Sequence, residues 1–138
     1  MTFQVNEEQY KGSIFNPFVP TKRDIQRTEE LATKNPVIAG LLGFLFPIGV
    51  CIYLNRFSNN LKINLYFLIL AAPIMFAFLS EPKKSYENEE QFLEDVDRII
   101  QKYSPIMSGV SFLGNIAMMA ENTRAITLAR KRKSEMNL

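Results

Sequence analysis

The side chains that most often carry enzyme chemistry are nearly absent from this sequence. Its 138 residues contain no His and no Trp, and Cys51 is the single cysteine. Without imidazole, histidine acid–base catalysis and His-ligated metal sites are excluded. One cysteine excludes an internal disulfide and a thiolate cluster, and burial near the end of an apolar segment favours a neutral, structural thiol. We therefore expect no catalytic residue, no metal and no cofactor.

One group of acids has a spacing that could attract cations. The acids recur at helical spacing and are Glu87, Glu90, Glu94 and Asp97. A calcium site needs oxygens that converge from a loop, whereas these carboxylates form a straight stripe. Exposed carboxylates also lack the burial that separates the pKa values of a catalytic pair. A solvated helix face is the favoured interpretation.

Two glycines imitate the spacing of a phosphate-binding loop. They are Gly109 and Gly114, but Asn115 and Ile116 stand where that loop needs Lys and then Ser or Thr. Without the lysine, the two glycines are predicted to lie in a helix-packing interface, because small residues let helices approach closely.

Basic residues gather near the C-terminus, where they follow an apolar segment: Arg130, Lys131, Arg132 and Lys133. A Lys or Arg near an anionic membrane surface contributes about 1 kcal/mol to binding. Contact with lipid headgroups is predicted for these four residues and for Arg56, which separates two apolar segments. Nucleic acid is the competing ligand, and the net charge of only +2 disfavours it.

The elements that must position these residues are dominated by three uncharged runs, 35–55, 63–80 and 103–120. Water-soluble helices need a polar face, and about 20 apolar residues are enough to cross a bilayer. We predict membrane spans over 36–54 and 63–80. The short turn between them makes the two spans an antiparallel transmembrane hairpin.

Capping, small and kinking residues occupy distinct places in this hairpin. Asn35 is a good N-cap for the first span. Pro47 and Pro73 lie inside the two spans, where helix kinks are expected, and at Pro47 either a kink or a broken helix. Ala39 and Gly43 form a small-xxx-small pair for helix packing, either within the protein or against another subunit.

The polar N-terminal arm, residues 1–34, is expected to contain a short helix over 22–34 that starts with a Thr21–Asp24 capping box. The arm also carries four aromatic residues, namely Phe3, Tyr10, Phe15 and Phe18. Two interpretations stay open for them, a flexible tail and a segment that contacts headgroups or a partner.

The remainder divides into a loop with an amphipathic helix (81–103) and a third hydrophobic helix that runs into a basic tail (104–138). Ser104 and Pro105 are predicted to separate the two helices. The third helix either spans the membrane or lies at its interface. The predicted fold class is thus an all-α integral membrane protein, a transmembrane hairpin with an amphipathic helix and a third membrane-associated or spanning helix.

The distribution of Lys and Arg gives the orientation only if the number of spans is known. Two spans place both tails on one side with most of the basic residues, which predicts cytoplasmic tails. Three spans divide the basic residues almost evenly and leave the orientation open. Bacterial inner, thylakoid and organellar membranes all fit.

Part of the first span has a recognisable pattern. Residues 34–42, KNPVIAGLL, are followed by Phe46 and Pro47 and, six residues after that proline, by Tyr53. This pattern resembles the small bacterial two-transmembrane-helix domain proteins, whose spans are joined by a P-G-L-G-Q-x-Y-N-G turn.

Two further features share the resemblance and three depart from it. Lys62 is similar to the basic residue that follows the turn, and residues 125–130, AITLAR, resemble the A-x-x-x-A-[KR] ending of such proteins. Residues 48–51 replace G-L-G-Q, residues 54–55 replace N-G, and no D-R-F motif follows. The resemblance implies a membrane hairpin and no particular activity.

The expected function follows from these features. We expect a small non-enzymatic membrane protein that is an accessory, structural or assembly subunit of a larger complex, with other integral membrane subunits and anionic lipid as partners. A small homo-oligomeric channel or transporter component is the alternative, although no charged residue lies within the three uncharged runs.

Overall fold

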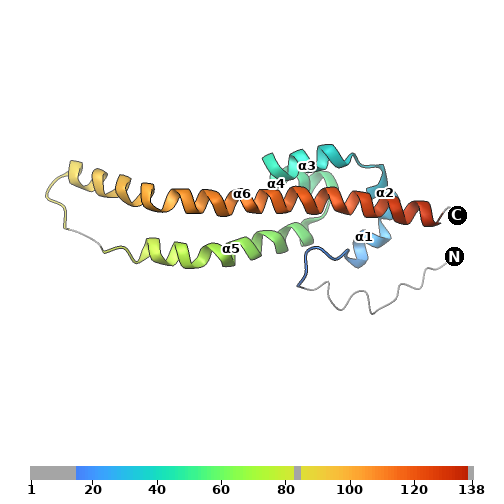
Figure 1. Cartoon of the computed structure of the whole chain (residues 1–138), viewed down its shortest axis with the longest axis horizontal. Coiled ribbons are helices and arrows are strands. Elements are labelled where there is room, and N and C mark those ends of the chain that lie inside the picture. The colour runs from blue at the N-terminus through green and yellow to red at the C-terminus, as the bar shows by residue number, and fades with distance from the viewer. Residues whose placement is uncertain (1–14, 83–84, 137–138) are drawn as a thin grey trace. The chain divides into compact units, whose positions relative to one another are not determined.

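The computed structural model describes residues 15–82 and 85–136, and within them the chain forms helices and no strand (Figure 1). The helices are α1 (Lys22–Gln26), α2 (Thr28–Thr33), α3 (Pro36–Leu45), α4 (Pro47–Leu54), α5 (Phe57–Leu79) and α6 (Glu89–Met136). The chain divides into two compact units. Unit 1 is residues 1–64 with 114–138, and unit 2 is residues 65–113.

The helix predicted over 22–34 is in fact two short helices, α1 and α2. The predicted capping box is confirmed: Thr21 accepts a hydrogen bond from the Asp24 N–H, and the Asp24 carboxylate accepts one from the Thr21 N–H. The break falls at Arg27, whose guanidinium donates to the carbonyls of Leu54 and Asn55. Arg27 thereby satisfies carbonyls that the end of α4 leaves free.

The first apolar segment, predicted as a span over 36–54, is two short helices instead of one, and it folds back on itself. Asn35 caps α3 as predicted, and the helix breaks at Phe46 before Pro47 begins α4. The Asn35 N–H donates to the Tyr53 hydroxyl at 3.0 Å, which joins the start of α3 to the end of α4. The segment therefore ends beside the point where it began.

The second apolar segment is a single helix, α5. Asn55 closes α4 with a left-handed backbone (φ 50°), which Asn tolerates, and α5 begins two residues later at Phe57. The helix starts earlier than the predicted span at 63 and continues through Pro73 without interruption. Among the described helices, α5 alone is long and apolar enough to cross a membrane by length and composition.

The predicted separation at Ser104 and Pro105 is also wrong, because α6 is one helix of 48 residues. A proline inside a helix removes one hydrogen bond and frees the carbonyl four residues earlier. Pro105 and Gln101, which carries that carbonyl, are both exposed, so the freed group is not trapped in a core. The amphipathic helix and the third hydrophobic helix of the prediction are therefore parts of α6.

In unit 1, α3 packs against the C-terminal half of α6 through glycines. A Cβ on Gly43 would lie 3.0 Å from the backbone O of Met118 and the backbone N of Met119, and one on Gly40 would lie 2.9 Å from Thr123 Oγ1. Glycine is needed at position 43 because the backbones of α3 and α6 approach so closely there, whereas a Cβ at position 40 would meet the Thr123 side chain. The largest fully buried apolar side chains of the unit are Leu31, Leu54, Ile63, Met118 and Ile126.

In unit 2, the C-terminal part of α5 lies beside the N-terminal part of α6. The rings of Phe78 and Tyr103 meet edge to face with centroids 5.8 Å apart. The Glu81 carboxylate pairs with Lys102 and accepts a hydrogen bond from the Tyr103 hydroxyl at 2.7 Å.

Of the four aromatic residues of the N-terminal arm, Phe3 and Tyr10 lie outside the described residues, whereas Phe15 and Phe18 are exposed.

The same substitution at two helical glycines tests this packing. Gly109→Ala should stabilise the protein by about 1 kcal/mol, because Ala is the better helix former and the new Cβ would meet nothing within 4 Å. Gly43→Ala should lose that gain and destabilise by about 1–3 kcal/mol, because its Cβ meets α6 backbone. Thermal unfolding followed by far-UV circular dichroism in detergent measures both; equal effects would refute the contact.

Candidate functional site

A buried guanidinium lies at the centre of unit 1. Arg56 Nε and Nη2 lie 2.9 Å from Asp24 Oδ1 and Oδ2, and Nη2 also lies 3.0 Å from Glu121 Oε1. The three side chains are only 2%, 5% and 1% exposed, respectively. We call Asp24, Arg56, Asn60, Glu121 and Asn122 the Arg56 cluster.

Local structure positions each side chain of the cluster. The capping box of α1 orients Asp24, and the left-handed turn at Asn55 directs the chain so that Arg56 precedes α5. Glu121 and Asn122 lie side by side on α6. The cluster thus joins three stretches of chain that are far apart in sequence.

Amides extend the cluster towards the thiol. Asn122 accepts from Arg56 Nη1 at 3.3 Å and donates to Asn60 Oδ1 at 3.1 Å and to the Met118 carbonyl at 2.8 Å. Asn60 in turn donates to Cys51 Sγ at 3.2 Å. Cys51 forms no disulfide and accepts this hydrogen bond at its sulfur. Because the thiol is buried, it is shielded from reagents.

The two acids that share Arg56 are shifted in opposite directions. Burial works to raise the pKa of Asp24, but the hydrogen bonds and charge of Arg56, with the Thr21 contacts, bring it below its ordinary value. For Glu121 burial outweighs the opposing charges of Arg56 and Arg124, so its pKa is raised. Burial opposes the charge on Arg56, yet Asp24 and Glu121 raise its pKa and keep it protonated.

The geometry of the cluster favours structural ion pairing over catalysis. Its carboxylates are engaged by arginines, including a 3.0 Å contact from Arg124 Nη1 to Glu121 Oε2. A cavity of about 90 Å³ beside Asp24 and Arg56 has room for a few water molecules and none for an organic substrate. Among residues 15–82 and 85–136, no three acids or cysteines converge as a metal site would require.

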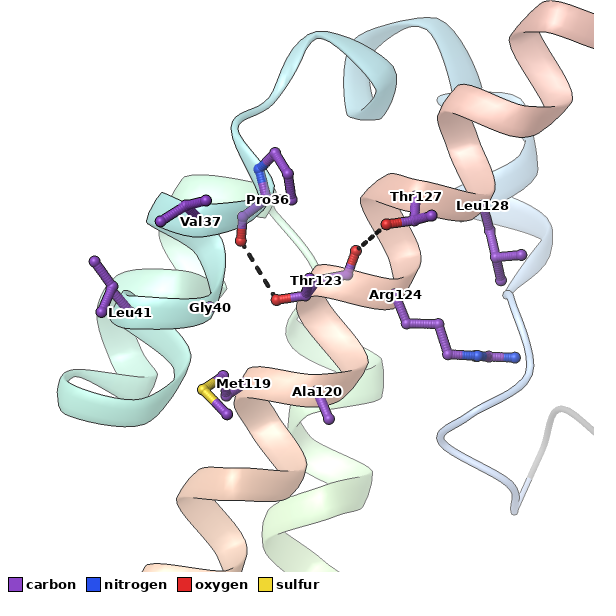
Figure 2. A pocket seen from close by; sticks show the side chains of 10 residues that line it. All are labelled: Pro36, Val37, Gly40, Leu41, Met119, Ala120, Thr123, Arg124, Thr127 and Leu128. Carbon is purple, nitrogen blue, oxygen red and sulfur yellow. Dashed lines mark hydrogen bonds between the residues drawn. The ribbon is translucent and has the colours of Figure 1, made fainter.

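A second feature of unit 1 is an apolar groove between α3 and α6 (Figure 2). Its volume is about 750 Å³. It is lined by Pro36, Val37, Gly40 and Leu41 from α3 and by Met119, Ala120, Thr123, Arg124, Thr127 and Leu128 from α6.

Basic residues lie at one end of this groove. Arg130 donates to the carbonyls of Ala32 and Lys34, just before α3 begins. Lys34 Nζ lies 5.0 Å from the centre of the Tyr53 ring. Lys131 is exposed and follows Thr127 by four residues, so it continues the groove face of α6.

The predicted headgroup residues are placed differently from one another. Arg56 was expected to contact headgroups, but its guanidinium is paired inside the protein because Asp24 and Glu121 surround it. Arg130 and Lys131 are exposed, and Arg132 and Lys133 are half-buried.

The residues predicted to pack between helices or to kink them also have different surroundings in the structure. Ala39 is fully buried and Gly43 contacts α6, whereas nothing lies within 4 Å of a Cβ built on Gly109; Gly114 is half-buried. Of the two prolines, Pro47 begins a new helix and Pro73 lies within an uninterrupted one.

Sequence reasoning missed the partners of Arg56. A signal was present: Arg56 and Glu121 each stand next to a long uncharged run, and Asp24 belongs to the capping box. When two apolar helices end on the same side of a membrane, the charged residues next to those ends are candidates to pair with each other. The interpretation of the first segment as a full span did not predict that Arg56 lies next to Asp24 and Glu121.

Comparison with protein-family models, with curated proteins and with solved structures finds no match to this chain.

Removal of Arg56 tests the cluster as the centre of unit 1. Arg56→Met should destabilise the protein by about 3–5 kcal/mol, because it leaves two buried carboxylates without their shared partner. Arg98→Met is the control: the Arg98 side chain is 58% exposed, and its partner Asp95, which is 7% exposed, keeps the hydrogen bond from the Tyr86 hydroxyl at 2.7 Å. The loss should therefore be smaller than for Arg56→Met, because the solvent screens the removed charge. Chemical unfolding in detergent measures both, and equal losses would contradict the assignment.

The opposite pKa shifts predict opposite pH responses. Asp24→Asn leaves the raised Glu121, whose contribution is full below its ordinary pKa of about 4.3 and is lost as pH rises. The melting temperature of the Asp24→Asn variant should therefore rise on acidification from pH 7, relative to the melting temperature of the wild type. Glu121→Gln leaves the lowered Asp24, whose contribution is lost as pH falls below about 3.9, so its melting temperature should fall there. Identical profiles for the two variants would refute these shifts.

Proposed function

We propose that this protein is a small non-enzymatic integral membrane protein that acts as an accessory or assembly subunit of a larger membrane complex. The observation that carries the proposal is the exposure of α5. Its apolar stretch is long enough to cross a bilayer, yet only 11% of that stretch is buried within the protein. A core helix of a soluble protein has the same composition but is covered by its neighbours, and α5 is not.

The large side chains on α5 support lipid or another membrane protein as its surroundings. Leu61, Ile69, Phe76 and Leu79 are between 61% and 74% exposed. Exposed apolar patches of this kind mark interaction sites for membranes or proteins. By contrast, the five polar side chains of the Arg56 cluster are buried.

We propose a re-entrant hairpin for α3 and α4 in place of the predicted first span. Helices of 10 and 8 residues extend about 15 and 12 Å, which is half or less of the roughly 30 Å of hydrocarbon. Membranes tolerate broken helices where protein covers the freed backbone. The return of Tyr53 to Asn35 favours entry and exit on one side.

In this topology α5 crosses the membrane and the uncharged part of α6 returns. The proposal accounts for the distribution of basic residues, because only four of the 16 Lys and Arg lie in residues 65–113. The rule that cytoplasmic segments are rich in Lys and Arg then favours a cytoplasmic position for α1, α2 and the C-terminal end of α6.

The accessory role is supported by what the polar groups do. The described carboxylates of unit 1 with shifted pKa values are paired with arginines, and Cys51 is buried. These contacts hold the protein together and present no nucleophile and base to a substrate. Uncovered apolar helix surface is what a partner subunit would contact.

Membrane extraction tests the proposal. The full chain should stay in membranes through a carbonate wash and, after gentle detergent extraction, migrate on native gels together with other polypeptides. Ile69→Arg places a charge in the middle of α5, which costs about 2.5–3.5 kcal/mol on insertion scales, and should reduce recovery in the washed membranes. Glu90→Arg, on the acidic part of α6, is the matched control and should not.

Two outcomes would contradict the proposal. Release of the wild-type chain by carbonate would exclude integral insertion. Migration only as a free 15.9 kDa species would contradict an accessory subunit. Migration only with further copies of the same chain, together with ion flux in liposomes that contain the purified protein alone, would favour the channel alternative.

A further inference from the structure

The groove between α3 and α6 has the surface of a hydrocarbon-binding site. Val37 and Leu41, on its α3 wall, are 66% and 55% exposed, and Met119 and Ala120 face them from α6 (Figure 2). Its volume of about 750 Å³ lies within the range of about 300–1,000 Å³ found for small-molecule sites.

The hydroxyl groups of the groove are already used within the protein. Thr123 donates to the Pro36 carbonyl at 3.3 Å, and Thr127 donates to the Thr123 carbonyl at 3.1 Å (Figure 2). A polar ligand would therefore find few free donors between the two walls. This favours an apolar chain as the occupant of the groove.

The charge at one end of the groove selects an anion. Lys131 lies one helical turn beyond Thr127 on the groove face of α6 and is exposed. Arg130, bound to the carbonyls of Ala32 and Lys34, adds a second positive charge where α3 begins. The Arg124 guanidinium extends away from α3 and is bound to the Glu121 carboxylate and the Phe18 carbonyl, so its charge is used within the protein (Figure 2). An apolar groove that ends at two positive charges complements an amphiphile with an anionic head.

The directions of the helices agree with such a ligand. α3 runs from Pro36 to Leu41 away from the basic end, and α6 runs from Met119 to Leu128 towards it. We infer that the groove binds one anionic phospholipid, with an acyl chain between α3 and α6 and its phosphate at Lys131 and Arg130. This inference rests on the proposed membrane location and adds a defined lipid site to it.

Native mass spectrometry of the full chain tests the site. The protein is purified in nonionic detergent, stripped of lipid, and titrated with phosphatidylglycerol or with phosphatidylcholine of the same acyl chains. One phosphatidylglycerol should bind per chain in preference to phosphatidylcholine. Glycerol phosphate, which has the charge but no acyl chain, should not compete.

Matched variants separate the groove from general attraction to the basic tail. Lys131→Gln should weaken phosphatidylglycerol binding by about fivefold and leave phosphatidylcholine unchanged, whereas Lys133→Gln, on another face of α6, should have no effect. Ala120→Phe fills the groove and should abolish the one-to-one adduct; Ile106→Phe, on an exposed apolar position elsewhere on α6, should not. Val37→Phe fills the groove from α3 and replaces Ala120→Phe if that variant does not fold.

The results that would overturn the inference are specific. Equal losses in Lys131→Gln and Lys133→Gln would indicate diffuse charge attraction, and full competition by glycerol phosphate would remove the role of the acyl chain. A photo-crosslinker at Ala120 that captures a polypeptide in membranes would assign the groove to a partner helix. These failures leave the carbonate-wash result unaffected, so they are distinguishable from failure of the proposed function.

Discussion

At the guanidinium of Arg56, one buried positive charge meets two buried carboxylates from distant parts of the chain. A charge removed from water costs several kcal/mol unless partners and hydrogen bonds replace the solvent. Asp24 can meet this requirement only if α1 packs against the junction of α4 and α5, and Glu121 only if α6 lies on the other side. The positions of three segments in unit 1 therefore depend on this contact.

The path of the first apolar segment fits this constraint. Arg27 binds the carbonyls at the end of α4, and Tyr53 binds the start of α3, so the chain returns to the level of Arg56 before α5 begins. Pro47 provides the break that this return needs, because it removes a helix hydrogen bond. A straight helix over the same residues would carry Arg56 away from Asp24.

Unit 1 buries the polar side chains of the Arg56 cluster beside its apolar core, and it leaves large apolar side chains exposed on α3 and α4. In water this arrangement would lose free energy twice, through desolvated charges and through exposed hydrocarbon. In contact with lipid, the exposed apolar side chains carry no free-energy penalty, and the buried charges form ion pairs with one another. The exposed apolar side chains thus support the proposed membrane location on physical grounds.

The amino-acid sequence by itself determined the local features of this protein: the Thr21–Asp24 capping box, the Asn35 cap, the break at Pro47, and the helical, strongly apolar character of residues 63–79. These depend on neighbours within about four residues along the chain, which a sequence displays directly. Only the tertiary structure decided that the first apolar segment turns back, that α6 continues through Pro105, and that Arg56 is buried instead of facing headgroups. Each of these depends on contacts between residues far apart in sequence, such as the 2.9 Å contact of Arg56 with Asp24. Local propensity and periodicity contain no record of such distant partners.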